Sequence, residues 1–289
     1  MDPRQPPAIY LFNDTSAVHA GSRAVMAALE AILAGGRIIG RHKVNTTAID
    51  EDAWARADWV VVNGEGTLHH DQPSGRFLLE QLGRAQEAGK RTALVNALFQ
   101  QEPPYHAAVL ARLDHFSVRE TASAASARAS GGNPAVKLDL SAAHYRSLPP
   151  RPPTRRLPPV NVGYQHEGAG LDFRVSDLPH PYYGLDDDFA AIVANLRATR
   201  LYITGQHHGV YAAGLAGVPF VAVGSNSHKI EGLIAWSGLP IPVCRRQSEL
   251  AAAVDFARGH RRVFLEFHRF LLAQPVLDAP ALWNDLAHS

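Results

Sequence analysis

The sequence predicts an α/β protein with two doubly wound domains that face a cleft, followed by C-terminal helices that pack back on the chain. Short runs rich in Val, Ile and Leu alternate with amphipathic stretches, which is the pattern of parallel strands covered by helices on both faces. A proline-rich segment interrupts this alternation once, and the pattern resumes after it. Ligands of such sheets bind at the carboxyl ends of the strands, so the loops that follow strands are the first candidate sites.

The first half of the chain contains six apolar runs that predict strands. They occupy residues 8–12, 37–44, 59–64, 91–98, 115–120 and 135–140. Between them, apolar residues at three- and four-residue spacing predict helices. These helices are expected at 22–35, 50–57, 76–89, 105–113 and 121–131.

The segment YRSLPPRPPTRRLPPVN is too rich in proline for a helix and predicts a stiff, extended connector. We place the domain boundary here, with an N-terminal domain at 1–147, a linker at 148–160 and a C-terminal domain at 161–289. The second domain repeats the alternation with strands at 160–166, 201–205, 219–224 and 241–244. Its helices are expected at 187–199, 207–217, 228–238 and 249–259, with terminal helices at 261–274 and 279–289.

Composition argues against nucleic-acid-binding, disulfide-bonded and membrane-spanning classes of protein. The net charge is +1, from 28 basic and 27 acidic residues, so no nucleic-acid partner is expected. The single cysteine, Cys244, excludes an intrachain disulfide and a Cys-rich zinc site. We find no signal-peptide pattern and no apolar run of about 20 residues that would span a bilayer. We therefore expect a cytoplasmic protein, with at most peripheral contact at the inner face of the membrane.

The loop NGEGTLHHD, after the third strand, is one candidate site. Gly64 and Gly66 permit a tight turn and close approach of a ligand, and Glu65, His69 and His70 add polar groups. The spacing is neither a dinucleotide fingerprint nor a P-loop. Adjacent histidines in a loop seldom converge on one ion, so no metal site is predicted. The alternative is a plain strand-to-helix turn.

The stretch TGQHHG, between a strand and a helix of small residues, is a second candidate. Free amides at a helix start favour an anion, and a histidine there can move a proton near neutral pH. His208 is the candidate for this role, whereas His207 is expected to pack or cap. Lys229, after the next strand, adds positive charge on the same edge. Arg119 follows an earlier strand and either grips an anion or pairs with a nearby carboxylate.

Taken in order, these motifs resemble the polysaccharide pyruvyl transferase family. The resemblance covers most of the chain through HAGSRAVM, NGEGTLHHD, SVRETAS, KLDL, TGQHHG, GVPFVAV and HKIEG. It implies two Rossmann-like domains of the GT-B type, with an acceptor side in the N-terminal domain and a donor side in the C-terminal domain. It also implies transfer of pyruvate from phosphoenolpyruvate to two hydroxyls of a surface-glycan sugar, with no cofactor. The acceptor would be a saccharide, and whether it is lipid-linked stays open.

Roles follow from the resemblance residue by residue. His208 and Glu65 would be catalytic, His208 as the acid or base. The donor-binding set would be Arg119, Gln206, His207 and Lys229. The acceptor-binding set would be Gly64, Gly66, His69 and His70.

One position departs from the family pattern. The family has an arginine where this chain has Gln206, and a neutral amide lacks the charge-assisted grip of a guanidinium, about 1.5–3 kcal/mol per hydrogen bond. This departure favours an alternative, a GT-B glycosyltransferase that uses a nucleotide-activated sugar. A non-catalytic relative that binds sugars or nucleotides is the third possibility.

Overall fold

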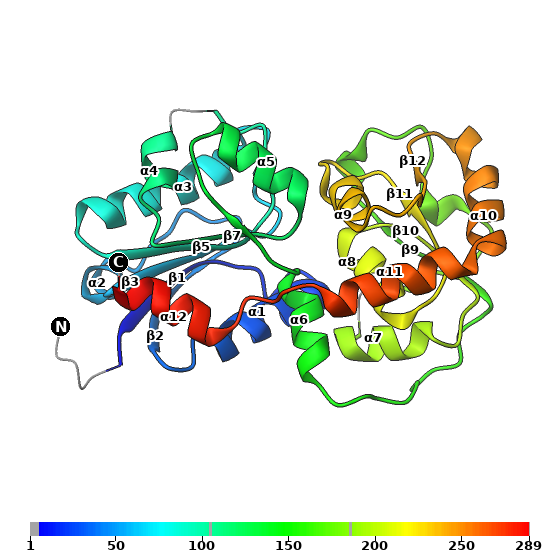
Figure 1. Ribbon diagram of the computed structural model, residues 1–289, viewed down its shortest axis with the longest axis horizontal. Coiled ribbons are helices and arrows are strands. Elements are labelled where there is room, and N and C mark those ends of the chain that lie inside the picture. Colours follow the sequence, from blue (N-terminus) through cyan, green and yellow to red (C-terminus); the bar gives the residue numbers. More distant parts are fainter. Residues whose placement is uncertain (1–5, 104–105, 185–186, 289) are drawn as a thin grey trace. The chain divides into compact units, whose positions relative to one another are not determined.

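The computed structural model describes residues 6–103, 106–184 and 187–288, and its chain divides into two compact units (Figure 1). Unit 1 comprises Met1–Val18, Val25–Leu140 and Pro275–Ser289, and unit 2 comprises His19–Ala24 and Ser141–Gln274. Each unit is built on its own parallel sheet. The fold is therefore the predicted α/β fold with two Rossmann-like domains.

Unit 1 has a six-stranded parallel sheet in the order β2-β1-β3-β5-β7-β8. Its strands are β1 (Ala8–Asp14), β2 (Arg37–Lys43), β3 (Trp59–Asn63), β5 (Arg91–Ala97), β7 (His115–Val118) and β8 (Ala135–Val136). Its helices are α1 (Ala20–Ile32, of which Ala20–Ala24 group with unit 2), α2 (Glu51–Arg56), α3 (Pro73–Glu87), α4 (Ala107–Ala111), α5 (Thr121–Ala129) and α12 (Ala279–His288). The predicted helix at 105–113 begins at Tyr105, which lies outside the described residues.

Local sequence explains both the central strand and the helix starts of unit 1. All five residues of β3 are buried, as expected for a central strand whose two faces are both covered. Asp50 caps α2 by accepting the amide of Ala53, and the carboxylate of Glu120 caps α5 at the amide of Ser123. Helix α3 starts at Pro73, where the missing N–H costs nothing because the first turn leaves it without an intrahelical acceptor.

The C-terminal helix α12 packs on unit 1. The indole of Trp283 lies 4.5 Å from that of Trp59, measured between ring centroids, and donates to the carbonyl of Ile32 at 2.9 Å. His115 contacts Asp285 at 2.6 Å. The predicted packing of the chain end against the earlier part of the chain is confirmed for this helix.

Unit 2 has a four-stranded parallel sheet in the order β12-β11-β10-β9. Its strands are β9 (Val160–Gln165), β10 (Leu201–Gly205), β11 (Phe220–Val223) and β12 (Val243–Cys244). Its helices are α6 (Leu140–Ser147, shared with unit 1 at its first residue), α7 (Phe189–Leu196), α8 (His207–Ala216), α9 (Lys229–Ser237), α10 (Leu250–Gly259) and α11 (Arg261–Ala273). Helix α11 covers α8, where Gly214 leaves room for Phe267 and Leu271.

The proline-rich segment contains no helix from Leu148 onward, as predicted, but its first three residues, 145–147, form the end of α6. The side-chain oxygen of Asn195 holds the segment by accepting the backbone amides of Thr154 and Arg155. The chain passes from unit 1 to unit 2 between Leu140 and Ser141, before the predicted linker at 148–160, and returns to unit 1 at Pro275. Helix α6 groups with unit 2, and the last 15 residues group with unit 1 because Trp283 and Asp285 pack there.

Two features have no sequence signal. A second sheet of unit 1 pairs β4 (Leu68–His69) with β6 (Phe99–Gln100), and strands of two residues show no periodicity. Helix α6 is short and ends just before the prolines. Among the helices in the described part of the chain, none is long and apolar enough to cross a membrane.

Candidate functional site

In unit 2, polar residues gather at the starts of α8 and α9, which follow the neighbouring parallel strands β10 and β11. Gln206 is the N-cap residue of α8, but its side chain makes no capping hydrogen bond. The backbone amide of Gln206 donates to the side-chain hydroxyl of Thr204 at 3.2 Å. Strand-to-helix connections of this kind leave backbone amides directed at the crevice beyond the sheet.

His207 joins the two helix starts. Its Nδ1 lies 2.9 Å from the carbonyl oxygen of Lys229, and a carbonyl only accepts, so Nδ1 carries the hydrogen. In the neutral ring the lone pair is then on Nε2. The side chain is 2% exposed and its ring packs edge-on against Tyr211. This geometry makes His207 a positioning residue that fixes α9 relative to α8, and its predicted role in donor binding stays a prediction.

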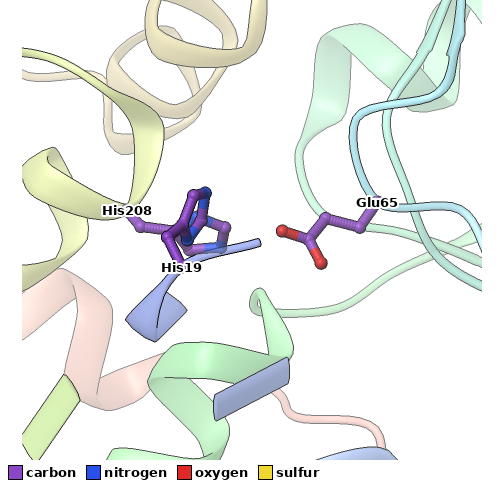
Figure 2. A group of neighbouring side chains, drawn as sticks. All are labelled: His19, Glu65 and His208. Atoms are coloured by element: carbon purple, nitrogen blue, oxygen red, sulfur yellow. The ribbon is translucent and has the colours of Figure 1, made fainter. Parts of the chain in front are cut away.

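His208 is buried beside a second imidazole of the same unit. The rings of His208 and His19 are 5.0 Å apart between centroids and meet edge to face, and Figure 2 shows the two side chains adjacent. Gly21 permits this packing, because a Cβ at that position would overlap the His208 ring. The Nδ1 of His19 accepts the amide of Ser22 at 3.1 Å, so the hydrogen of the neutral His19 ring is on Nε2.

Lys229 begins α9, as predicted. Its ammonium donates to the side-chain oxygen of Asn226 at 2.8 Å. It also lies close enough to His166 for its charge to lower the pKa of that imidazole, although burial of His166 is the larger cause. The positive charge of Lys229 therefore reaches the loop after β9.

That loop forms a pocket of about 270 Å³ which the sequence did not reveal. Tyr164 at the end of β9 and Tyr182 beside it are 40% and 54% exposed. Arg174 also lines the pocket, and among the described residues it has no ion-pair partner. Gln165 holds the turn around it, accepting the amide of Val175 at 2.6 Å and donating to the carbonyl of Phe173 at 3.0 Å.

His166 gives this pocket a defined hydrogen-bond donor. Its Nδ1 accepts the amide of Gly168 at 3.0 Å, so Nε2 carries the hydrogen in the neutral ring. Burial and the nearby Lys229 lower its pKa, which keeps the ring neutral at pH 7. The only acidic side chain among the described lining residues is Glu167. Aromatic faces, a guanidinium and an N–H donor together suit a ring that carries an anionic group.

In unit 1, Glu65 is buried and oriented. The hydroxyl of Thr15 donates to its carboxylate at 2.7 Å, and its own amide donates to the side-chain oxygen of Asn63 at 3.2 Å. Figure 2 also draws this side chain. Gly66 has φ of +66°, which glycine adopts without strain, whereas Gly64 packs against Ala97. The predicted catalytic role of Glu65 and the predicted acceptor contacts of the glycines stay predictions.

His69 and His70 lie together in unit 1. Their Nδ1 atoms are 2.9 Å apart, and His69 is in β4. His70 and Asp71 both have positive φ, at 56° and 51°, a region that Asn, Asp and His enter more often than other residues with side chains. Glu102 accepts the amide of Asp71 at 3.3 Å and is itself buried, which raises its pKa to about 7. The predicted acceptor contacts of His69 and His70 stay predictions.

Arg119 lies in the interior of unit 1. It is 2% exposed, and its guanidinium is 3.2 Å from the carboxylate of Asp139, which is fully buried. Of the two alternatives that the sequence left open, the ion pair is the one that the structure shows. A donor clamp at Arg119 would require this buried pair to open.

Metal binding has little support within unit 2. His19 and His208 offer two imidazoles, but among the described residues of that unit no third His, Cys, Asp or Glu completes a set of three. Catalytic zinc sites use three protein ligands. The expectation that no metal is bound stays a prediction.

No protein-family model matches the chain, and no curated protein matches it in sequence. Solved structures do align with it. The S. aureus MnaA-UDP co-structure aligns with a TM-score of 0.61 at 12% identity, over 98% of this chain and 95% of that one. A putative UDP-N-acetylglucosamine 2-epimerase from Listeria monocytogenes gives 0.55 at 11%, over 98% and 95%. A UDP-glucosyltransferase from Polygonum tinctorium gives 0.51 at 10%, over 93% and 94%.

Identities of 10–12% establish a shared fold and nothing finer. The structures include glycosyltransferases and a putative nucleotide-sugar epimerase, so the GT-B part of the family resemblance is confirmed. None of them points to pyruvyl transfer, and that part stays a prediction.

Proposed function

We propose that the chain is a GT-B-type glycosyltransferase that takes a nucleotide-activated sugar as donor and a saccharide as acceptor. The observation that carries the proposal is the pocket after β9, where Tyr164, His166, Arg174 and Tyr182 surround about 270 Å³. A nucleoside diphosphate combines a flat ring with adjacent negative charge, and this lining offers a partner for each. The GT-B fold agrees with the proposal, since each of the three structures named above carries UDP or a UDP-sugar in its name.

The cations of unit 2 have a defined task in such a reaction. The acceptor hydroxyl attacks the anomeric carbon of the donor, and the bond from that carbon to the diphosphate oxygen breaks. The electron pair stays on the leaving nucleoside diphosphate, where Arg174 and Lys229 would stabilise the added charge. Neutral His166 would add a hydrogen bond from Nε2.

The proton of the acceptor hydroxyl needs a base. We assign this role to His208, because it is an imidazole at the start of α8 and a second imidazole, His19, packs beside it. Replacing His208 by Ala should lower kcat by about 10²–10⁴ while leaving donor binding within about twofold. Full activity in the folded variant would remove His208 from the mechanism.

Pyruvyl transfer from phosphoenolpyruvate is the second candidate, and the placement of Lys229 and the two histidines at the helix starts of unit 2 supports it. Two observations weigh against it. Gln206 stands where the resemblance requires an arginine, and Arg119 is engaged with Asp139 in unit 1. The small donor would then depend on Lys229 as its main cation.

Donor binding separates the two candidates directly. We would titrate the chain with UDP-glucose, UDP, GDP-mannose and phosphoenolpyruvate by calorimetry, and repeat each titration with Arg174→Gln. Loss of one charge-assisted hydrogen bond should weaken the nucleotide about tenfold to hundredfold. Arg258→Gln is the matched control, because Arg258 is an exposed arginine on α10. Binding of phosphoenolpyruvate alone, or nucleotide binding that is indifferent to Arg174, would contradict the proposal.

A further inference from the structure

Unit 1 contains a larger pocket, of about 510 Å³, whose lining differs from that of unit 2. It lies beyond the carboxyl ends of β1, β2 and β3, where Asn13, His42 and Thr67 border it. Ligands of parallel sheets bind at this edge. None of the residues predicted for the acceptor side is among its described lining residues.

The described lining residues of this pocket carry no Asp, Glu, Lys or Arg. They present hydroxyl groups from Thr46, Thr47, Thr67 and Ser74, and amide groups from Asn13 and Asn45. Phe77 and Leu78 supply an apolar surface. A neutral, hydroxyl-rich wall next to an aromatic ring matches a sugar, which has hydroxyls around its rim and C–H groups on its faces.

His42 is held neutral by its surroundings. Its Nε2 lies 2.8 Å from the carbonyl oxygen of Thr46, so Nε2 carries the hydrogen and donates it. Its Nδ1 then accepts the amide of Asn13 at 3.5 Å. Burial lowers the pKa of this imidazole, and its ring lies 5.0 Å from that of Phe77 between centroids. The imidazole of His42 therefore adds no charge to the pocket at neutral pH.

Several polar groups of the lining remain available to a ligand. Among the described residues, the side chains of Asn45, Thr47 and Ser74 make no hydrogen bond, and all three are exposed. The side-chain nitrogen of Asn13 is engaged within the protein, since it donates to the carbonyl of Asn63 at 2.7 Å and to the hydroxyl of Thr67 at 3.1 Å. The side-chain oxygen of Asn13 is the group that a ligand could use.

Two asparagines shape the backbone around the pocket. Asn13 and Asn45 have φ of 62° and 60°, in the left-handed region that asparagine enters more readily than most residues other than glycine. Here they turn two amide side chains into the same pocket wall.

We propose that this pocket binds an uncharged saccharide residue of the acceptor. The proposal rests on the proposed function only in naming the saccharide as acceptor; the pocket's preference for a neutral sugar follows from its own lining. An acidic sugar is disfavoured, because its carboxylate would lose water and meet no cation.

Saturation-transfer difference NMR on the full chain tests the inference without any donor. The probes are methyl β-glucoside, methyl β-galactoside and N-acetylglucosamine, with methyl β-glucuronide as the charged counterpart, each at up to 10 mM. We expect at least one neutral probe to bind with millimolar affinity and the glucuronide to bind at least tenfold more weakly. Ser74→Trp should fill the pocket and abolish the signal, whereas Ala125→Trp, on the exposed side of α5, should leave it unchanged.

Thr47→Val covers the case in which Ser74→Trp perturbs the fold, because it removes one hydroxyl without adding volume. It should weaken the neutral probe about threefold to tenfold, consistent with the loss of one neutral hydrogen bond. No neutral probe bound, equal binding by Ser74→Trp, or equal binding of the glucuronide would overturn the inference. Saccharide binding without nucleotide binding would instead refute the proposed function and leave this inference standing.

Discussion

The guanidinium of Arg119 lies 3.2 Å from the carboxylate of Asp139, and the two side chains are 2% and 0% exposed. The sequence brings Arg119 to the end of β7 and Asp139 to the start of α6, 20 residues later. Two charges buried together are stable only as a pair, because each alone would have to give up its hydration with no compensation. This relationship gives Arg119 a structural partner in unit 1, and its predicted role in donor binding stays a prediction.

Removing one partner should therefore affect stability. Arg119→Met or Asp139→Asn alone should lower the free energy of unfolding by about 3–5 kcal/mol, and the double variant Arg119→Met/Asp139→Leu should recover most of it. Urea unfolding followed by circular dichroism measures both. If the single variants unfold like the native chain but lose donor affinity, Arg119 is a ligand residue after all.

The packing of His208 against Gly21 predicts a steric coupling between α8 and the first turn of α1. A Cβ at position 21 would overlap the imidazole, so Gly21→Ala should destabilise the native chain by about 1–3 kcal/mol. In a His208→Ala background, Gly21→Ala should no longer lower the free energy of unfolding. It should raise it by about 0.5–1 kcal/mol, because alanine has a higher helix propensity than glycine.

This double-mutant cycle needs no substrate, because its readout is the free energy of unfolding. Gly259→Ala provides a comparison, since a Cβ at Gly259 meets no atom within contact distance. Equal effects of Gly21→Ala in both backgrounds would show that the imidazole is not packed on this turn.

The sequence was sufficient for the elements whose cause is local. The apolar runs of β3 and β10 and the small-residue helix α8 were predicted because burial on both faces leaves a direct trace in composition. Helix α6 was missed because eight residues of mixed character before a proline run carry too weak a period.

The candidate sites could be predicted only in part, for a physical reason. His208, Lys229 and Glu65 stand out because they follow strands, and parallel strands bring their carboxyl ends together. The partners that decide their roles are distant in sequence: His19 lies 189 positions before His208, and Asn226 was unremarkable in its loop. Both pockets also depend on loops that lack regular periodicity, so their walls could not be read from pattern alone.

Glu102 predicts a pH dependence of stability in unit 1. Burial raises its pKa to about 7 from an ordinary 4.5, so the folded state prefers the protonated carboxyl. The associated stability is fully present below pH 4.5 and is lost as the pH rises through about 7. Glu102→Gln keeps the oxygen that accepts the amide of Asp71 but cannot ionise. It should raise the free energy of unfolding by about 1–3 kcal/mol at pH 8 and by less than about 1 kcal/mol at pH 5.

Urea titrations at the two pH values measure this difference, with Glu87→Gln as the control, because that carboxylate is exposed on the last turn of α3. A gain from Glu102→Gln that is the same at pH 5 and pH 8 would show that ionisation of Glu102 does not govern it.

Cys244 predicts a conformational readout for unit 2. The thiol is 1% exposed, and burial, with a smaller contribution from Glu249, raises its pKa to about 11. At pH 8 only about one thiol in a thousand is then ionised, roughly a hundredfold fewer than for an ordinary cysteine, and the thiolate is the reactive form. Labelling with a disulfide reagent at pH 8 should therefore be slow in the native chain and immediate in urea.

Val18→Cys, at a position 52% exposed, should add one fast-reacting thiol and leave the slow one unchanged. Rapid labelling of Cys244 in the native chain would mean that β12 opens far more readily than its burial implies.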